Sequence, residues 1–554
     1  MKTRLIPIAV LCICAFFTVL NAQGQDVLTA SQWQKDLRFL QTTVHKDHPF
    51  LFKKVTAEAF DTSVEELYNE IPNLEDHEIP VSFSRIVSLF EYGHTQIPFS
   101  TVAKRGVLPV NLYHFNDGVF IEGTTKAHQK ILGAKVLKVG GKSIEKVMEL
   151  VRPVVPVEND QYFKAYGLRF VTVPDVLHSQ KVISKISDKV SVTLQKNGKT
   201  FEYVLPKIEL EKMSRDYSLT VPNESWISAR DTSETPLYLK DLHEKYYYFE
   251  FLPDTKTLYV RQSSVFNHES ESLKDFYNRL FEFIDTHTID KLIYDVRLNG
   301  GGNNYNNLPL IKGLMARPNI NQKGKFFYII GRRTFSACQN LTNEIGRYTE
   351  AIMVGEPTSE NINFYGDSKK VTLPNSKINA YLSFAWWQDL PAWENRDATV
   401  PSIAVDMSFE EYKTNQDPVL ATALNYTTKS DEIFDPFEHL RNLFIEGKFE
   451  QVQSDAAKFV KDPKYKYYDF ENEFIKTAAH VMKGGNLQAG YFILGMVIKL
   501  YPESANALYH FGDVQQKMNN LEGAKEAYDK VIALNTDASL TKSAQERLKE
   551  LDKK

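Results

Sequence analysis

Residues 245–430 alternate between apolar strand-like runs and helix-like runs, and this rhythm constrains the fold more than any other feature of the sequence. The runs KLIYD and KFFYII are short, apolar and rich in β-branched or aromatic residues, and each leads through a loop into a helical pattern. Repeated β–α units predict a largely parallel sheet covered by helices. Ligands and catalytic groups of such sheets gather where the strands end. We therefore predict a multidomain α/β protein whose α/β core occupies residues 209–430.

Two different patterns precede the core. Residues 23–104 carry apolar residues at helical spacing, with Ser31 placed to cap the first helix, and they predict an N-terminal helical domain. Residues 105–208 instead show alternating runs and the turn dipeptide Asn197–Gly198. This pattern predicts a small β-rich binding module that contains a hairpin.

The last segment, residues 435–554, is helical and repetitive. The stretches NLQAGYFILGMVIKL and NLEGAKEAYDKVIAL begin at Asn486 and Asn520, 34 positions apart, and several of their apolar residues are in register. A 34-residue period with small residues near the start of each unit is typical of tetratricopeptide (TPR) repeats. We predict TPR-like helical repeats; the alternative is two amphipathic helices that are alike by chance.

The N-terminal residues predict export of the chain. Lys2 and Arg4 precede an apolar stretch that is slightly short for a membrane span, and a small residue, Ala22, ends it. This order is typical of a secretory signal peptide, residues 1–22, and the alternative is an uncleaved anchor. Of the three cysteines, only Cys338 lies beyond this segment. Cys338 therefore has no partner for an internal disulfide. A secreted protein of this size without disulfides fits a bacterial periplasm better than a disulfide-stabilised extracellular scaffold, so we expect a periplasmic protein.

The charge balance excludes several classes of function. A net charge of −4, with 25% charged residues, provides no basic stretch for nucleic acid or for a membrane surface. No later apolar run is long enough to span a membrane, and no Cys/His pair has the spacing of metal ligands. We therefore expect no nucleic-acid partner, no membrane span in the mature chain, no metal and no cofactor.

Ser336 lies between the run at 325–330 and a helical pattern, and two roles fit that place. A serine at a helix start is usually a cap, whose hydroxyl accepts a backbone N–H. It can also be a nucleophile, because helix-start amides such as that of Ala337 can stabilise an oxyanion. The glycine loop at 299–304 follows the neighbouring strand and can add the amide of Gly301, with no side chain in the way.

A serine nucleophile needs a general base. His94 is the best candidate, because it directly follows Gly93, which marks a turn. The alternative for His94 is a purely structural role, which is common for a lone histidine. The other histidines that we considered have no glycine turn directly beside them, and they are His114, His268 and His287.

Four motifs, taken in their order along the chain, resemble the C-terminal processing and tricorn-core serine peptidases. They are EYGHT at 91–95, KLIYDVRLNGGGN at 291–303, GRRTFSACQN at 331–340 and AIMVGEPTSEN at 351–361. The β-rich module resembles the PDZ-like domain of this family, best at GAKVLKVGGKSIEKVMELV. The resemblance covers about residues 28–425. It implies a crotonase-like (ClpP-like) α/β core and a PDZ-like module.

The resemblance also implies roles for individual residues. Ser336 is the nucleophile, His94 accepts its proton, and the two backbone amides named above hold the oxyanion. One branch of the family uses a lysine as the base, but Asn361 occupies that position here. A late glutamate of the family is matched loosely by Glu394 in WENRDATVPS, as an orienting carboxylate; the alternative is a surface glutamate on a loop. Cys338 occupies a small-residue position, and we expect it to be packed and inert.

The sequence thus predicts a secreted serine peptidase that hydrolyses peptide bonds through an acyl-enzyme. Its substrate is a peptide or protein, guided by the PDZ-like module, and the TPR-like tail holds a protein partner or a second copy. The alternative is a catalytically inactive peptide-binding scaffold of the same fold, because the family motif G-D-G-H-T is EYGHT here and Gly300 replaces the usual proline. An acyl-CoA enzyme on a crotonase-like sheet fits poorly with a signal peptide.

Overall fold

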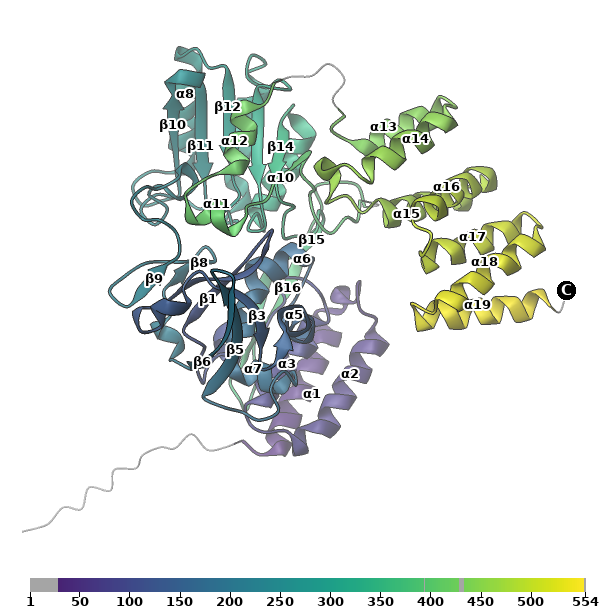
Figure 1. Ribbon diagram of the computed structural model, residues 1–554, viewed down its shortest axis with the longest axis horizontal. Coiled ribbons are helices and arrows are strands. Elements are labelled where there is room, and N and C mark those ends of the chain that lie inside the picture. The colour runs from purple at the N-terminus through teal and green to yellow at the C-terminus, as the bar shows by residue number, and fades with distance from the viewer. Residues whose placement is uncertain (1–27, 393, 428–432, 553–554) are drawn as a thin grey trace, which may run out of the picture.

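A computed structural model describes residues 28–392, 394–427 and 433–552. The chain is a mixed α/β protein with a helical front, two main sheets and a helical tail (Figure 1). The signal peptide predicted at residues 1–22 lies outside the described residues. Within the described ranges, no helix combines the length and the hydropathy that a membrane crossing requires.

The front of the chain is formed by helices α1 (Ala30–Asp47), α2 (Ala57–Glu70), α3 (Glu78–Ser88) and α4 (Phe99–Val102). The cap of α1 is Thr29, and the prediction of Ser31 was wrong. The Thr29 hydroxyl accepts the N–H of Gln32, whose side chain accepts the N–H of Thr29 in return. This reciprocal capping box satisfies two backbone donors, which Ser31 inside the first turn cannot do. The apolar faces of α1, α2 and α3 pack against the hairpin of β15 (Phe364–Thr372) and β16 (Asn379–Trp387).

The first sheet follows the front helices and has the strand order β1-β2-β3-β5-β6, with β4 and β9 at its side. Its β5–β6 hairpin turns at Asn197 and Gly198, as predicted, and both residues have positive φ, as a type I′ turn requires. Helices α5 and α7 contribute apolar residues to its core. The bounds are β1 (Val110–Phe115), β2 (Gly118–Thr125), β3 (Lys135–Val139), β4 (Lys142–Ser143), α5 (Ile144–Val151), α6 (Asp160–Tyr162), α7 (Pro174–Ser179), β5 (Lys189–Lys196), β6 (Lys199–Pro206), β7 (Arg215–Asp216), β8 (Leu219–Thr220) and β9 (Trp226–Ser228).

The second sheet has the order β10-β11-β12-β13-β14-β17 and is parallel from β11 onward. Helices α8, α9 and α10 pack on one face and α12 on the other, which explains why β12 and β13 are almost wholly apolar. Since β12 and β13 pair in parallel, the glycine loop and Ser336, which follow them, meet at one edge, as predicted. The bounds are β10 (Tyr247–Leu252), β11 (Thr257–Gln262), α8 (Leu273–Thr286), β12 (Lys291–Asp295), α9 (Leu308–Met315), β13 (Phe326–Ile330), α10 (Ala337–Tyr348), β14 (Ile352–Gly355), β17 (Ile403–Ala404), α11 (Phe409–Lys413) and α12 (Pro418–Asn425).

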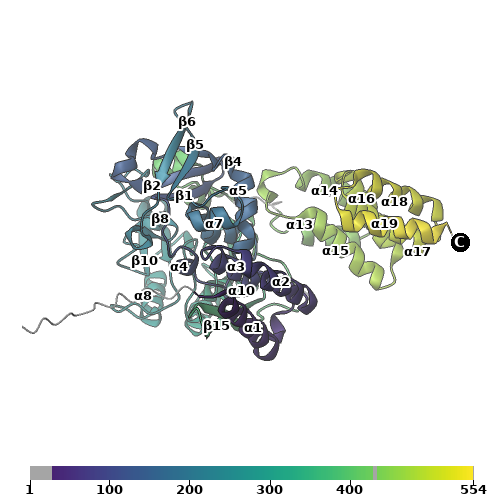
Figure 2. The same ribbon diagram turned by 90° about the horizontal axis from the view of Figure 1, so that it is seen from below.

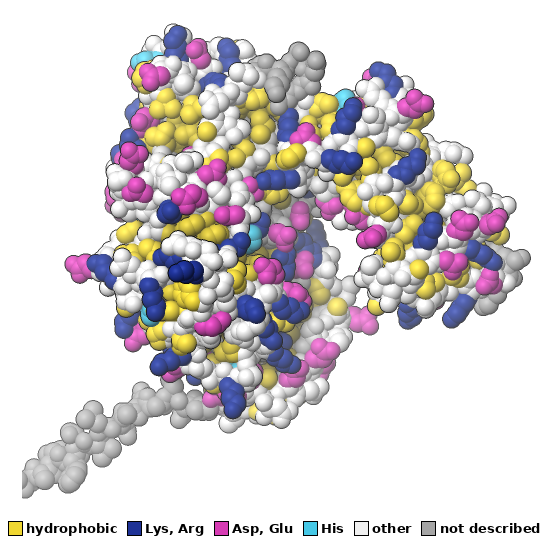
Figure 3. Space-filling view, in the orientation of Figure 1, with side chains coloured by type: hydrophobic (Ala, Val, Ile, Leu, Met, Phe, Trp, Pro, Cys, Tyr) yellow, Lys and Arg dark blue, Asp and Glu magenta, His cyan; other side chains and the backbone are white. Residues whose placement is uncertain are grey.

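The tail consists of antiparallel helix pairs that extend to one side of the other domains (Figure 2). The 34-residue repeat is visible in its caps, because Asn486 and Asn520 accept the amides of Ala489 and Gly523 in the same way. On the face shown in Figure 3, acidic and basic side chains are interspersed over the body and the tail. The bounds are α13 (Pro436–Ile445), α14 (Phe449–Phe459), α15 (Phe470–Lys483), α16 (Leu487–Leu500), α17 (Ala505–Lys517), α18 (Leu521–Leu534) and α19 (Ala538–Leu551).

Candidate active site

Ser336 occupies the turn that joins the loop after β13 to helix α10. Its φ of 56° and ψ of −130° lie in a region that residues with a side chain seldom adopt. Backbone strain of this kind costs on the order of 1–3 kcal/mol and is retained where the surrounding structure imposes it, often at functional sites. The side chain makes no capping bond to α10. The hydroxyl therefore does not serve as a helix cap, which was one of the two roles that the sequence left open.

The glycine loop packs directly against this turn. A Cβ atom on Gly301, whose φ is 99°, would lie 2.6 Å from the Cβ of Ser336 and 2.9 Å from the backbone nitrogen of Ala337. The Gly301 N–H donates to Oδ1 of Asn299 at 2.9 Å. The Ala337 N–H has no hydrogen-bond partner among the described residues. Of the two predicted oxyanion donors, one is thus free and the other is held within its own loop.

Glu360, which no sequence pattern indicated, links Ser336 to His94. Its Oε2 accepts the backbone N–H of Ser336, and its Oε1 lies 3.4 Å from Nε2 of His94, without hydrogen-bond geometry. The His94 ring stacks on Phe335, with centroids 4.9 Å apart, and its side chain is 21% exposed. No hydrogen bond joins the His94 ring to the Ser336 hydroxyl. The structure therefore brings the two predicted residues into one site through Phe335 and a shared carboxyl.

Glu158 is a second buried carboxyl behind the site, and no sequence pattern indicated it either. Its Oε1 accepts the N–H of Gly93 at 2.7 Å, and its Oε2 accepts the N–H of Asn361 at 3.0 Å and the Asn361 side-chain amide. Gly93 and Asn361 are the chain neighbours of His94 and Glu360. Glu158 therefore sets the spacing between the imidazole of His94 and the carboxyl of Glu360.

Burial controls the protonation of this site. It lowers the pKa of His94 below the ordinary value, so the ring is neutral near pH 7 and can accept a proton. Burial, reinforced by the neighbouring Glu360, raises the pKa of Glu158 to about 8. Burial also raises the pKa of Glu360 well above its ordinary value, although the Ser336 N–H opposes this shift. The pair of carboxyls therefore holds at least one proton near pH 7.

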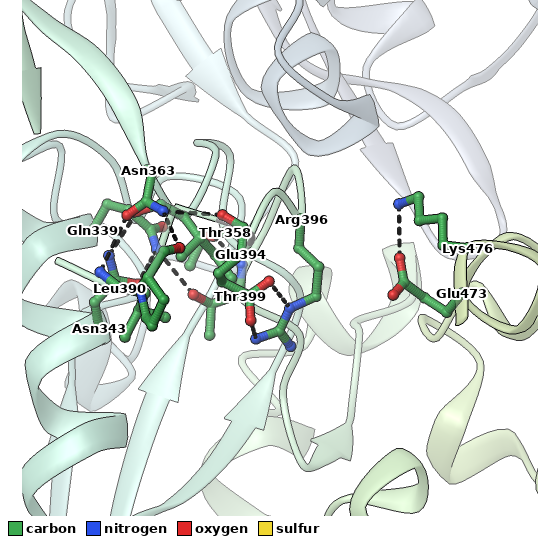
Figure 4. Close-up of polar contacts among 12 residues, drawn as sticks. Gln339, Asn343, Thr358, Asn363, Leu390, Glu394, Arg396, Thr399, Glu473 and Lys476 are labelled. Carbon is green, nitrogen blue, oxygen red and sulfur yellow. Dashed lines mark hydrogen bonds and ion pairs between the residues drawn. The ribbon is translucent and has the colours of Figure 1, made fainter. Parts of the chain in front are cut away.

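Glu394, the carboxylate implied by the resemblance, makes no hydrogen bond or ion pair with His94 or Ser336. Its carboxylate pairs with the Arg396 guanidinium at 2.7 and 2.8 Å, and Figure 4 shows the two side chains facing each other. Its backbone carbonyl accepts the amide of Asn363 at 3.0 Å. The carboxyl that lies beside the His94 ring is that of Glu360, and an orienting role for Glu394 stays a prediction.

Two other predicted features lie in the same region. Cys338 is fully buried, and burial raises the pKa of its thiol, so the sulfur is a packed side chain. Asn361, at the position of the family lysine, bonds to Glu158 and accepts Nζ of Lys54 at 3.2 Å. Among the described residues, no group of three or more His, Cys, Asp or Glu side chains is placed to hold a metal ion.

Comparison with known proteins gives structural neighbours that include proteases. No family model and no curated protein matches the sequence. Mature CPAF is 10% identical, with 73% of this chain and 99% of that chain covered and a TM-score of 0.45. The photosystem II D1 C-terminal processing protease is 12% identical, with 68% and 93% covered and a TM-score of 0.31. The tricorn protease is 12% identical, with 72% and 36% covered and a TM-score of 0.34. At such low similarity, the chemistry of this chain rests on its own residues.

We predict that Gly93→Ala displaces the His94 loop. The added Cβ would lie 2.4 Å from the Tyr162 ring and 2.9 Å from the Phe335 ring. The variant should lose about 1–3 kcal/mol of stability and react more slowly at Ser336, as measured by thermal melting and by the rate of fluorophosphonate labelling. Gly495→Ala in the tail, where the nearest atom is 3.8 Å away, is the matched control. Unchanged labelling in the Gly93 variant would show that the loop does not position the base.

We predict that Glu360→Gln slows labelling of Ser336 far more than Glu394→Gln does. The Gln side chain can still accept the Ser336 N–H, but its amide would then donate to Nε2 of His94 and favour the wrong tautomer. An equivalent change in a Ser–His–Asp triad lowers kcat by about 10⁴, and we expect a loss of at least about tenfold here. A larger loss in the Glu394 variant would contradict this result and favour the carboxylate implied by the resemblance.

Proposed function

We propose that this protein is a serine peptidase that hydrolyses peptide bonds through an acyl-enzyme on Ser336. One observation carries the proposal: the carboxyl of Glu360 binds the backbone of Ser336 and also faces the His94 ring. The strained, uncapped serine at the start of α10 supports it, as does the free Ala337 amide. These are the parts that acyl transfer needs: a nucleophile, a neutral base and an oxyanion donor.

In the proposed mechanism, the Ser336 hydroxyl attacks the substrate carbonyl carbon while His94 takes its proton. Nε2 of His94 faces Glu360, so Nδ1 is the nitrogen that remains for the hydroxyl. When ionised, Glu360 accepts the Nε2–H of His94 and stabilises the imidazolium that forms. His94 then gives this proton to the leaving amine, which breaks the peptide bond. Water activated by the same ring attacks the acyl-enzyme, releases the acid and returns the proton to Ser336.

The oxyanion formed in each attack is held by backbone amides. The Ala337 N–H points out of the start of α10 without a partner, and the Gly301 N–H joins it once released by Asn299. Removal of one such donor typically lowers kcat by about 10²–10³. The left-handed φ of Gly301 lets its peptide group approach the serine so closely, because any side chain there would overlap Ser336.

The other domains take supporting roles in this proposal. Residues 105–208 act as a PDZ-like module that binds an extended chain by strand addition, and residues 209–430 form a crotonase-like core. Residues 435–554 form TPR-like repeats for a protein partner, supported by the repeated asparagine caps. The signal peptide predicted at residues 1–22 directs the chain to a bacterial periplasm.

A second candidate function is a catalytically inactive peptide-binding scaffold. Two observations favour it: the His94 ring makes no hydrogen bond to Ser336, and the Gly301 N–H is occupied by Asn299. Catalysis requires both contacts to change when a substrate binds. A chain in which they persist would bind peptides without cutting them.

We predict that a fluorophosphonate labels the wild-type protein at Ser336 and that Ser336→Ala abolishes labelling. Only a serine with an adjacent base and an oxyanion site reacts with this probe at a useful rate. Mass spectrometry of the labelled peptide identifies the site, and the control is Ser63→Ala in α2, where the hydroxyl donates to the Ala59 carbonyl of its own helix. A folded wild-type protein that remains unlabelled would favour the scaffold.

We predict that labelling falls as the pH is lowered, with a midpoint below pH 6.5. Protonated His94 cannot accept a proton, and burial lowers its pKa, so the ring stays competent to a lower pH than an ordinary histidine. Measuring the labelling rate between pH 4.5 and 8 gives the midpoint of this fall. A midpoint at or above 6.5 would show either that the ring is stabilised as a cation or that the proton on Glu360, whose pKa burial raises, limits the reaction.

A further inference from the structure

A cavity of about 310 Å³ lies between the first sheet and the α/β core, and three arginines line it. Arg169 comes from the 3-10 turn η6 (Leu168–Thr172), Arg215 from β7, and Arg333 from the loop that leads to Ser336. All three side chains are half-buried, and their Nε atoms are buried without a hydrogen-bond partner among the described residues. The cavity thus presents several unused guanidinium donors.

The charge of these arginines is not neutralised by the acids around them. None of the three forms an ion pair within the described residues, and Arg333 donates only to the Ser218 hydroxyl, at 2.9 Å. Asp216, which also lines the cavity, pairs with His243 at 3.2 Å. Glu122 carries the acidic charge that acts on Arg215, and its carboxylate is occupied by the polar groups of Asn111, Thr220, Ser228 and Tyr412.

The arrangement is electrostatically unfavourable as it stands. Burial lowers the pKa of Arg169 to about 10, and Arg333 contributes to this shift. Burial, followed by repulsion from Arg169 and Arg333, lowers the pKa of Arg215 to about 9. Like charges that share a half-buried site are stabilised by an anion that binds between them. The cavity therefore has the electrostatics of an anion site.

Tyr166, which lines the cavity, connects it to the turn that carries Ser336. The Arg333 guanidinium lies 5.0 Å from the centre of the Tyr166 ring, which packs on Phe335 with centroids 5.6 Å apart. Phe335 directly precedes Ser336, and the Tyr166 hydroxyl lies 3.9 Å from the place of a Cβ on Gly300. The turn after Arg215 is strained, since Tyr217 and Ser218 have φ of 47° and 68°, as is common next to ligand sites.

We propose that this cavity binds the side-chain carboxylate of an Asp or Glu residue of the peptide substrate, close to the scissile bond. The proposal rests on the proposed function, because it names the substrate class of the same site. Guanidinium groups match the planar geometry of a carboxylate and bind it in a bidentate way. Val110, Leu112 and Met213 line the apolar wall of the cavity, which suits the methylene stem of an acidic side chain.

The test measures binding in the Ser336→Ala background, so that it does not depend on catalysis. The probes are fluorescent decapeptides of alanine and serine, N-acetylated and C-amidated, with one central Glu or Gln. We expect the Glu peptide to bind at least about tenfold more tightly by fluorescence anisotropy, less so at high salt. Arg169→Gln and Arg215→Gln should each remove most of this difference. Arg441→Gln, an exposed arginine of α13, makes the same charge change and should leave it intact.

Folding of each variant is checked by its melting temperature. Arg215→Lys keeps the positive charge but cannot bind a carboxylate in the bidentate way of a guanidinium, so it should bind the Glu peptide with intermediate affinity. Equal binding of the Glu and Gln peptides overturns the proposal, even if the wild type is labelled at Ser336. Tighter binding of a neutral peptide with a free C-terminus, lost with the arginines, also overturns it in favour of a chain-end site. A Glu preference without labelling at Ser336 supports this site while it contradicts the peptidase.

Discussion

Three hydrogen bonds to the buried carboxyl of Glu158 hold together the segments that carry the candidate site. The donors are the backbone of Gly93 in the front domain and the backbone and side chain of Asn361 in the core. A carboxyl without such partners would be costly to bury. Because the donors adjoin His94 and Glu360, these bonds decide that the imidazole faces a carboxyl of another domain. The rest of the site depends on this junction.

The strained turn at Ser336 is maintained by the same assembly. Glu360 accepts its backbone N–H, and Gly301 packs against its Cβ, so neither the backbone nor the side chain is free to relax. The turn follows strand β13 of the second sheet, which is buried by helices on both faces. The local cost of the strain is offset by contacts from two other parts of the chain, the glycine loop and Glu360. The hydroxyl of Ser336 therefore stays free of its own helix.

Local patterns in the sequence predicted most of the architecture. The apolar runs of β12 and β13, the turn at Asn197–Gly198 and the 34-residue repeat all depend on neighbours in the chain, and the structure contains each of them. The predicted cap of α1, Ser31, lies two residues after the true cap, Thr29. Serine and threonine are both common caps, and the sequence around them does not show which one begins the helix. Glu158 and Glu360 were missed, since a carboxyl in an irregular segment has no periodicity that marks it as buried.

The sequence by itself therefore determined the order of the elements and the strand ends that carry the glycine loop and Ser336, and it predicted His94 as the base. Only the tertiary structure decided that the serine hydroxyl is not a cap, that Glu360 and not Glu394 faces the imidazole, and that Arg169, Arg215 and Arg333 share one cavity. The physical reason is that these contacts join residues far apart in the chain. Their distances and burial depend on how whole domains pack, and local propensity contains no information about that packing.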